Sequence, residues 1–520
     1  MKKSVIILAL LAGVSVVMQC SAAAASAVYT KNRSVAITSE VDKALAADWQ
    51  KKGLLPVMEA SDSLLVRRLY LDLNGRLPSI EEAKSFVYSR DVQKYEKLVD
   101  TLLSSRDFVS YFGMHFCDIL RVKSEFPINL WPNAVYTYQR RIEEFLEKNE
   151  PYHKFIRALL LAQGSNFRMP ESNFYRAHAD RSPSGMAKNV MLTLFGIRLE
   201  KMPEKSQKLY ANIFEEIGFK STKEWKEEIV FVKPCPARKI MLPSGVERDV
   251  APGEEARRIF ADYATGTREG HELLARALVN RAWHWFLGAG IAAGEADNLL
   301  DSKAVNDKLL EVLVRQTVDN KMNFRELCRT IVLSAAYRSA SFQGKDTVKK
   351  VKAFAAYPVR RLEAEVLDDV ITGLTLESSH YSSVIPEPFT FLPAEMKTVS
   401  IADGSISSSF LILFGRPSRD AGVLSERNNT INAKQRLFLY NSGALYRKVC
   451  RIMRRKEFAQ LHFSARVEAF YWMFFSRPPT AGEMAIIRKR YDERPPKMRW
   501  TMENDLAWIM VNSAEFLHRH

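Results

Sequence analysis

The sequence predicts a mainly α-helical protein made of two helical domains joined by a small β-hairpin or extended connector. Apolar residues recur at spacings of three and four over most of residues 61–233 and 254–520, which is the period of an α-helix. Between these regions, short β-type runs flank the turn sequence Pro243-Ser244-Gly245. The chain has 520 residues, 47% of them hydrophobic, so it is long enough to bury a sizeable core.

The first predicted domain, residues 61–233, reads as successive amphipathic helices after a lead-in over residues 28–60. One apolar helix ends near Gly75, and Ser79 with Glu82 three residues later forms a capping box that starts the next helix. Two later helices begin with proline, whose missing amide hydrogen costs little at a first helical position. Further helices are predicted over residues 106–123, 132–148 and 152–162.

The second predicted domain, residues 254–520, follows the connector over residues 234–253. Its helical periodicity starts at once and is interrupted only in the middle of the domain. The chain ends in a short segment with His518 and His520, which is expected to fray. Closing helices are predicted over residues 433–455, 464–475, 481–493 and 501–516.

Residues 377–410 form a Ser- and Pro-rich excursion from the helical pattern. Proline lacks the amide donor of a helix interior, so this segment is predicted as a long ordered loop on the surface. Phe389, Phe391 and Leu392 are expected to anchor the loop, because apolar side chains gain free energy when they leave water.

Residues 1–27 have the order of a secretory signal peptide: two lysines, an apolar run, and small residues that permit cleavage near Ala27. A lipid anchor at Cys20 is the less favoured alternative, because Met18 and Gln19 fit such a site poorly. No later run reaches the roughly 18 apolar residues of a membrane helix, so no transmembrane span is expected in the mature chain. The expected location is the periplasm, the cell surface or the medium.

The formal net charge is +16, and part of the positive excess is clustered. Clusters of like charge attract polyanions through their summed potential. Outside the cytoplasm the expected partner is an anionic or carbohydrate polymer or an envelope protein, and not nucleic acid. The alternative is a solvated helix face without a partner. The clusters are Arg447, Lys448, Arg451, Arg454, Arg455 and Lys456, followed by Arg488, Lys489 and Arg490.

Four cysteines follow the predicted signal peptide, and no two of them form a Cys-x-x-Cys. Disulfides are compatible with export, but the spacing alone cannot pair these residues. Buried thiols are the favoured interpretation, because three of the four lie in apolar helical runs. The residues are Cys117, Cys235, Cys328 and Cys450.

His115, Asp118 and Arg121 are spaced three apart on a predicted helix, so they are expected to share one face. A histidine beside a carboxylate suits proton transfer or metal binding. The same residues also suit a buried ion pair that locks two helices together, and this structural role is favoured.

Asn280, Arg281 and Trp283 lie next to His284 and Trp285 on another predicted helix. Aromatic faces beside an amide and a guanidinium suit sugar stacking and hydroxyl hydrogen bonding. A plug between the two domains is the favoured alternative for this cluster.

Arg361, Glu365 and Asp369 belong to a charged segment that begins a helix after Pro358. Acidic residues near a helix start complement the positive end of the helix dipole, which is the favoured explanation. Alternatively, Glu365 and Asp369 at i and i+4 could share a cation or act as an acid and base pair.

Arg416, Arg419 and Glu426 flank a glycine-bearing loop over residues 420–429. Charged loops held by a scaffold often carry binding. An internal network of salt bridges explains the same residues and is favoured.

No hydrolase, zinc-protease, phosphate-loop or dinucleotide-binding motif occurs in the sequence. A binding role is therefore favoured over catalysis. The alternative is an enzyme, such as a glycan-directed hydrolase, with a site between the two domains. Convergence of the residues above on one pocket would support that alternative.

Two series of short strings run in order along residues 60–517. The first series is RLYLDLNGRLP (68–78), EPY (150–152) and GSNF (164–167). The second series is ALVNRAW (277–283), SAAYR (334–338), RRLEAE (360–365), FGRP (414–417), RPPT (477–480) and NSAEF (512–516). Together they resemble the planctomycete-type cytochrome-associated surface proteins, which are made of two paired domains of unknown function. The resemblance implies an exported envelope protein.

Many members of that family carry a Cys-x-x-Cys-His after a Gly-x-Arg-Leu helix end, and some add a cytochrome-c domain. Here residues 196–199 match the helix end, but residues 200–205 contain neither a thiol nor a histidine. Covalent haem attachment needs all three groups. We therefore expect no haem, no other cofactor and no metal at this place, and no cytochrome-c domain. Lys201, Glu204 and Lys205 should form a solvated polar loop instead.

Overall fold

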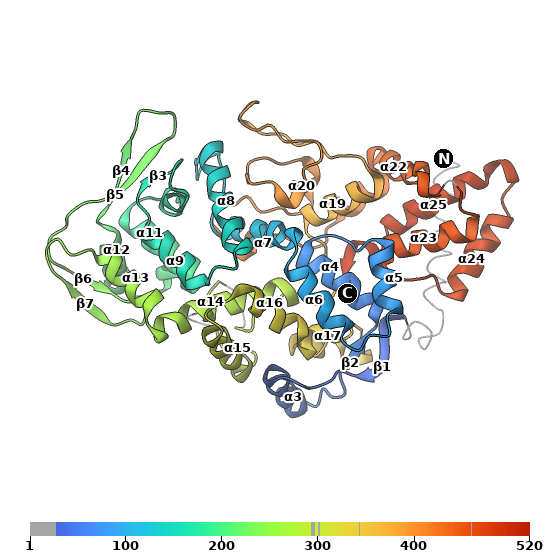
Figure 1. Cartoon of the computed structure of the whole chain (residues 1–520), viewed down its shortest axis with the longest axis horizontal. Coiled ribbons are helices and arrows are strands. Elements are labelled where there is room, and N and C mark those ends of the chain that lie inside the picture. Colours follow the sequence, from blue (N-terminus) through green and yellow to red (C-terminus); the bar gives the residue numbers. More distant parts are fainter. Residues whose placement is uncertain (1–27, 293–296, 300–301, 343, 459) are drawn as a thin grey trace.

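The computed structural model describes residues 28–292, 297–299, 302–342, 344–458 and 460–520. The predicted signal peptide, with Cys20 and the cleavage position near Ala27, lies outside these residues. Figure 1 shows the strand-bearing middle of the chain, from β4 to β7, at one end of the molecule and helices α23 to α25 at the opposite end.

The prediction of a mainly helical protein is confirmed. The first half of the chain forms α3 (Glu40–Lys51), α4 (Asp62–Asn74), α5 (Ile80–Tyr88), α6 (Lys94–Leu103), α7 (Arg106–Ile119), α8 (Pro132–Glu147), α9 (Tyr152–Leu160), α10 (Asn173–Arg176), α11 (Pro183–Phe195) and α12 (Glu204–Phe214). The second half forms α13 (Ala256–Gly266), α14 (Arg268–Leu287), α15 (Asp307–Asp319), α16 (Phe324–Leu333), α17 (Ala335–Arg338), α18 (Thr347–Lys352), α19 (Ala364–Thr375), α20 (Ser409–Leu413), α21 (Ala433–Asn441), α22 (Gly443–Cys450), α23 (Phe463–Phe475), α24 (Ala481–Asp492), α25 (Arg499–Val511) and α26 (Ala514–Leu517).

The strands form small antiparallel sheets of two or three strands. The predicted hairpin is present as β6 and β7, and the structure adds a three-stranded sheet before it in the order β3-β5-β4. The strands are β1 (Thr30–Ser34), β2 (Met58–Ala60), β3 (Gly164–Ser165), β4 (Ile217–Ser221), β5 (Glu228–Val232), β6 (Arg238–Met241), β7 (Glu247–Val250), β8 (Arg360–Arg361) and β9 (His518–Arg519).

The end of α4 and the start of α5 follow from local chemistry, as predicted. Gly75 caps α4 with φ +61, and a Cβ at this position would lie 2.7 Å from the ring of Tyr111. Glycine is required there because other residues are strained in the left-handed region and no space exists for a side chain. Ser79 and Glu82 form the reciprocal capping box of α5.

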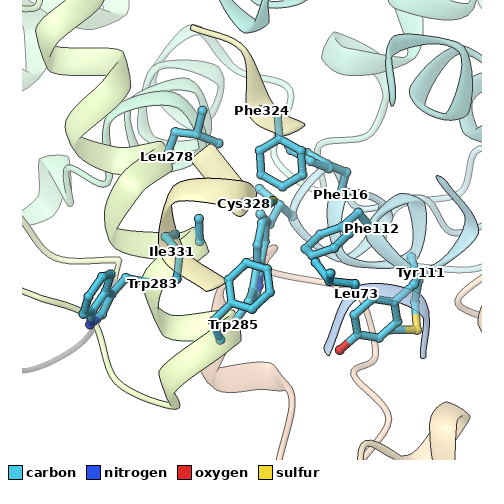
Figure 2. Close-up of a cluster of buried hydrophobic side chains, with 14 of the residues drawn as sticks. Leu73, Tyr111, Phe112, Phe116, Leu278, Trp283, Trp285, Phe324, Cys328 and Ile331 are labelled. Atoms are coloured by element: carbon cyan, nitrogen blue, oxygen red, sulfur yellow. The ribbon is translucent and has the colours of Figure 1, made fainter. Parts of the chain in front are cut away.

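Aromatic side chains from both halves of the chain meet in one continuous core (Figure 2). The ring of Phe116 in α7 lies 5.7 Å from that of Trp285 in α14 and 5.3 Å from that of Phe324 in α16. Phe112 also contacts Trp285, with ring centroids 6.0 Å apart. Each buried aromatic ring of this kind contributes about 1.5–3 kcal/mol by leaving water. Packing therefore holds α7 of the N-terminal half against α14 and α16.

Two expectations about the C-terminal half are wrong. The chain end does not fray, because His518 and Arg519 form β9, which pairs with β8 and lies next to α4 (Figure 1). Phe391 does not anchor the excursion, since it is 61% exposed, and Phe389, 48% exposed, contacts Trp131 at the surface rather than the core. The excursion itself is a long loop with little regular structure, as predicted.

The four cysteines of the described chain form no disulfide and are thiols. Cys117 and Cys328 are buried, and burial raises the pKa of Cys117 to about 12. A thiol with such a pKa stays protonated and behaves as a small apolar side chain.

Candidate functional site

A cavity of about 480 Å³ lies between the N-terminal and C-terminal halves of the chain. Its size falls in the range of roughly 300–1,000 Å³ that is typical of small-molecule sites. Helices α7 and α14, the segment around β8, the loop over residues 417–431 and the C-terminal strand line it. We call it the central cavity and define it by His115, Asp118, His284, Arg361, Glu363 and Arg427.

Asp118, in the last turn of α7, ties the loop after α20 to the N-terminal half. Arg419 Nε donates to Asp118 Oδ1 at 2.8 Å, and Arg427 Nη2 donates to Asp118 Oδ2 at 2.7 Å. Arg427 Nη1 also donates to Glu365 Oε2 at 2.6 Å, and Arg416 Nε lies 3.4 Å from Glu365 Oε1. Burial opposes ionisation of Asp118, but Arg427 and Arg419 outweigh it and lower its pKa.

Glu363 and Asp72 form a second buried ionic group around Arg519. Arg519 Nη2 donates to Glu363 Oε2 at 2.8 Å, and its Nε lies 3.0 Å from Asp72 Oδ1. The hydroxyl of Tyr111 donates to Glu363 Oε2 at 3.0 Å, and that of Tyr357 donates to Asp72 Oδ2 at 2.7 Å. Burial opposes ionisation of Glu363, but Arg519 outweighs it and holds the pKa well below its usual range.

Arg361 gives the cavity a positive charge that no carboxylate neutralises directly. Its guanidinium donates to the carbonyls of Leu362 at 3.0 Å and Asn428 at 3.1 Å, and also to that of Phe414. Within the described residues it makes no ion pair. The residues of the two buried ionic groups, taken together with Arg361, leave two positive charges in excess. They are Arg360, Arg361, Arg416, Arg419, Arg427 and Arg519 against Asp72, Asp118, Glu363 and Glu365.

The three histidines that line the central cavity favour the neutral form. Burial lowers the pKa of both His115 and His284 to about 4, and burial also lowers that of His518. The ring of His115 stacks on Trp285 with centroids 5.1 Å apart. Neutral imidazoles each offer one donor and one acceptor to a polar ligand.

Glu426 holds the loop that closes this side of the cavity. Its Oε1 accepts hydrogen bonds from the hydroxyl of Ser418 and the backbone amides of Asp420 and Ala421, each at 3.0 Å. Its Oε2 accepts from the amide of Gly422 at 2.9 Å. A carboxylate bound by several amides fixes the loop shape, so Glu426 has a positioning role.

The structure brings part of the predicted site together. His115, Asp118 and Arg361 line the central cavity, while Glu365, Arg416 and Arg419 lie directly behind it in the ionic network. The network of salt bridges that the sequence favoured for the loop is therefore present.

The expected shared face of His115, Asp118 and Arg121 is wrong. Helix α7 ends at Ile119, and Arg121 follows it with φ +57. The Arg121 guanidinium points elsewhere, donating to the carbonyl of Ala421 at 3.1 Å and to Thr193 Oγ1 at 3.1 Å.

Asn280, Arg281 and Trp283 are buried and do not line the central cavity, which suits the favoured packing role better than sugar stacking. Arg281 is buried, and its Nε donates to Asp297 Oδ1 at 3.0 Å. Trp283 is fully buried against Phe354, with ring centroids 5.4 Å apart. Successive helical residues are about 100° apart, so only some of this segment can face one cavity. His284 and Trp285 line the cavity, whereas these three residues do not.

The sequence did not identify Asp72, His284, Glu363, His518 and Arg519 as site residues. The sequence could have indicated Asp72, since a carboxylate inside an apolar helix needs a hydrogen-bonding or ionic partner when it is buried. For Arg519 no local pattern could have shown its pairing.

A larger space of about 770 Å³, the lateral cavity, lies between the α4–α5 connection, α19, residues 394–399 and α23. Asp369 lines it and accepts hydrogen bonds from the amides of Thr398 at 2.6 Å and Val399 at 3.0 Å. Burial raises the pKa of Asp369 to about 7, although both amides oppose this shift. Glu365 belongs to the central network instead, in agreement with the favoured ion-pair explanation, so nothing supports the alternative in which Glu365 and Asp369 act as a pair.

In the described part of the chain, no group of three or more His, Cys, Asp and Glu side chains is arranged to hold a metal ion. Across the same residues, no helix combines the length and hydrophobicity that crossing a bilayer needs. Lys201, Glu204 and Lys205 are exposed, in a short 3-10 turn and at the start of α12.

These features define a helical protein whose two halves are joined by a buried ionic network beside a cavity. Residues 40–196 match the model of PSCyt2, a protein of unknown function (DUF1549), and residues 256–491 match that of PSD1, a protein of unknown function (DUF1553). The chain thus belongs to the proteins that pair these planctomycete cytochrome-associated domains, which confirms the resemblance. No curated protein and no solved structure matches it.

Proposed function

We propose that this protein binds the acidic group of a saccharide, a uronate or a sulfate ester, in the central cavity. The observation that carries the proposal is the excess of two positive charges among the buried ionic residues, Arg361 included, around a cavity of about 480 Å³. Guanidinium groups in a low-dielectric site bind carboxylate or sulfate oxygens strongly. Arg361 is the best-placed ligand, since it is not committed to a carboxylate.

The remaining lining suits the rest of a sugar. Neutral His115 and His284 offer hydrogen-bond partners for hydroxyls. The signal peptide predicted over residues 1–27 supports this proposal, because export would take the protein to the cell envelope or beyond, where acidic polysaccharides occur.

The test measures binding of trigalacturonate to the mature chain by calorimetry, with neutral maltotriose as the comparison ligand. Arg361→Met should weaken trigalacturonate binding by about tenfold to a hundredfold, because a hydrogen bond to a charged group contributes roughly 1.5–3 kcal/mol. Arg140→Met is the matched control, since the Arg140 side chain is 82% exposed. Equal affinity for maltotriose, or an unchanged affinity in Arg361→Met, would reject the proposal.

The central cavity favours binding over hydrolysis. Glycosidases need one carboxylic acid that stays protonated near the working pH. Asp118 and Glu363, the carboxylates that line this cavity, both have lowered pKa values and are engaged by arginines.

A specific observation favours glycan hydrolysis in the lateral cavity as a second candidate function. Asp369, with a pKa of about 7, could donate a proton near neutral pH, and Glu81, Glu395, Glu457 and Glu468 line the same space. The protonated form of Asp369 is lost as pH rises through about 7, so activity should fall there.

Asp369→Asn should lower any release of reducing ends from polygalacturonate by at least about 100-fold, the usual contribution of a general acid. The exposed Asp346→Asn serves as the control variant. The second candidate is refuted by the absence of hydrolysis in the unmodified protein or by full activity in Asp369→Asn.

A further inference from the structure

Three aromatic rings from separate segments meet on the surface, far along the chain from one another. The ring of Trp131, before α8, lies 6.0 Å from that of Trp225 in the β4–β5 turn and 5.4 Å from that of Phe389 in the excursion. We call these three residues the aromatic platform. The rings are inclined by 80° and 54°, so they form an angled surface rather than a flat stack.

The packing of the rings against one another leaves much of their area in water. Trp225 is 67% exposed and Phe389 is 48% exposed. Exposed apolar area costs free energy, and a cluster of large rings at loop positions is typical of an interaction site. Tryptophan and phenylalanine at a turn and a loop tip contribute little to the core, which lies elsewhere.

The β4–β5 turn beside the platform carries a positive charge. Lys226 Nζ lies over the Trp225 ring at 5.4 Å from its centroid, and Lys220 and Lys223 are exposed in the same hairpin. Glu224 is the exposed acidic residue of this turn, so the turn is net positive. Glu227 is buried beneath it and accepts a hydrogen bond from Thr222 Oγ1 at 2.9 Å.

We propose that the aromatic platform of Trp131, Trp225 and Phe389 is a second binding site, which holds an acidic polysaccharide chain by stacking sugar rings on aromatic faces and pairing their anionic groups with Lys223 and Lys226. Sugar rings present C–H faces that pack on aromatic rings, while their hydroxyl edges stay in water. A protein surface of the same chemistry is less well matched, because the rim of the platform is lysine-rich and lysine is depleted at protein interfaces. The platform does not depend on the central cavity.

Affinity electrophoresis of the mature chain through gels that contain polygalacturonate tests this site, with neutral dextran as the comparison polymer. Trp225→Ala should weaken retention by about tenfold, the effect of losing one aromatic contact of roughly 1.4 kcal/mol. The double variant Lys223→Glu with Lys226→Glu should lose retention at low salt, and high salt should abolish retention of the unmodified chain. Tyr440→Ala removes a similarly exposed ring elsewhere and should change nothing.

The same series in the Arg361→Met background separates the two sites. The platform proposal is supported if Arg361→Met is still retained on polygalacturonate and the added Trp225→Ala abolishes this retention. This result does not depend on whether the central cavity binds a saccharide. Retention that is unchanged in Trp225→Ala overturns the proposal. A second result would also overturn it. If polygalacturonate does not retain the chain, and ultracentrifugation shows a concentration-dependent dimer that Trp225→Ala abolishes, the platform is a protein interface.

Discussion

Replacing Arg519 with methionine is expected to lower the free energy of unfolding by about 3–5 kcal/mol, the usual cost of breaking a buried ion pair. The Arg519 side chain is fully buried and is shared by Glu363 and Asp72. Its loss would leave two carboxylates in the interior without their principal counter-charge. Urea unfolding followed by circular dichroism measures the effect.

Two further variants make this result specific. Arg140→Met removes an exposed arginine and should change stability by less than about 0.5 kcal/mol. Adding Glu363→Gln to Arg519→Met should recover part of the loss, because one unpaired charge is then gone. A loss below about 1 kcal/mol in Arg519→Met would contradict the role we assign to the network.

Acidification from pH 7 to pH 4 is expected to destabilise the protein, with about 3 kcal/mol of the loss coming from His115. Burial lowers the pKa of His115 from 6.5 in the unfolded chain to about 4 in the folded chain. Between these values the unfolded state binds a proton that the folded state does not. Stability from this group is therefore fully present above pH 6.5 and is lost as pH falls toward 4.

Urea unfolding at a series of pH values checks this sign. His115→Phe keeps an aromatic ring beside Trp285 and should show a shallower loss on acidification than the unmodified chain. The exposed His380→Gln should leave the pH dependence unchanged. An identical pH profile in His115→Phe and the unmodified chain would show that another group controls acid stability.

The helices could be predicted because their information is local. Gly75, Ser79 and Glu82 determine where α4 ends and α5 starts, and each acts within four residues. The end of α7 could not be placed as well, since the apolar pattern runs on to Val122 while the backbone turns at Arg121. The pairing of β3 with β5 could not be predicted from the sequence either, because β3 has only two residues.

The candidate site could be predicted only in part, because its contacts join distant residues. Asp118 and Arg427 are 309 positions apart, and Arg519 reaches the carbonyl of Leu71 across 448 positions. Residue type and spacing showed that Asp118 and Arg361 carried chemistry, but they could not show the partners. The sequence also left two roles open for Trp283, since a buried and an exposed tryptophan look alike in sequence.

The C-terminal strand β9 makes the first half of the chain depend on the second half. Because Arg519 neutralises Asp72 of the first half, a fragment that ends before β9 would keep Asp72 in an apolar helix without this counter-charge. Asp118 of the first half would likewise lose Arg419 and Arg427, and these two arginines would lose the carboxylate of Asp118. The two halves of this chain are therefore expected to fold and unfold as one cooperative unit, and exchanging one half for that of a relative requires exchange of the matching ions.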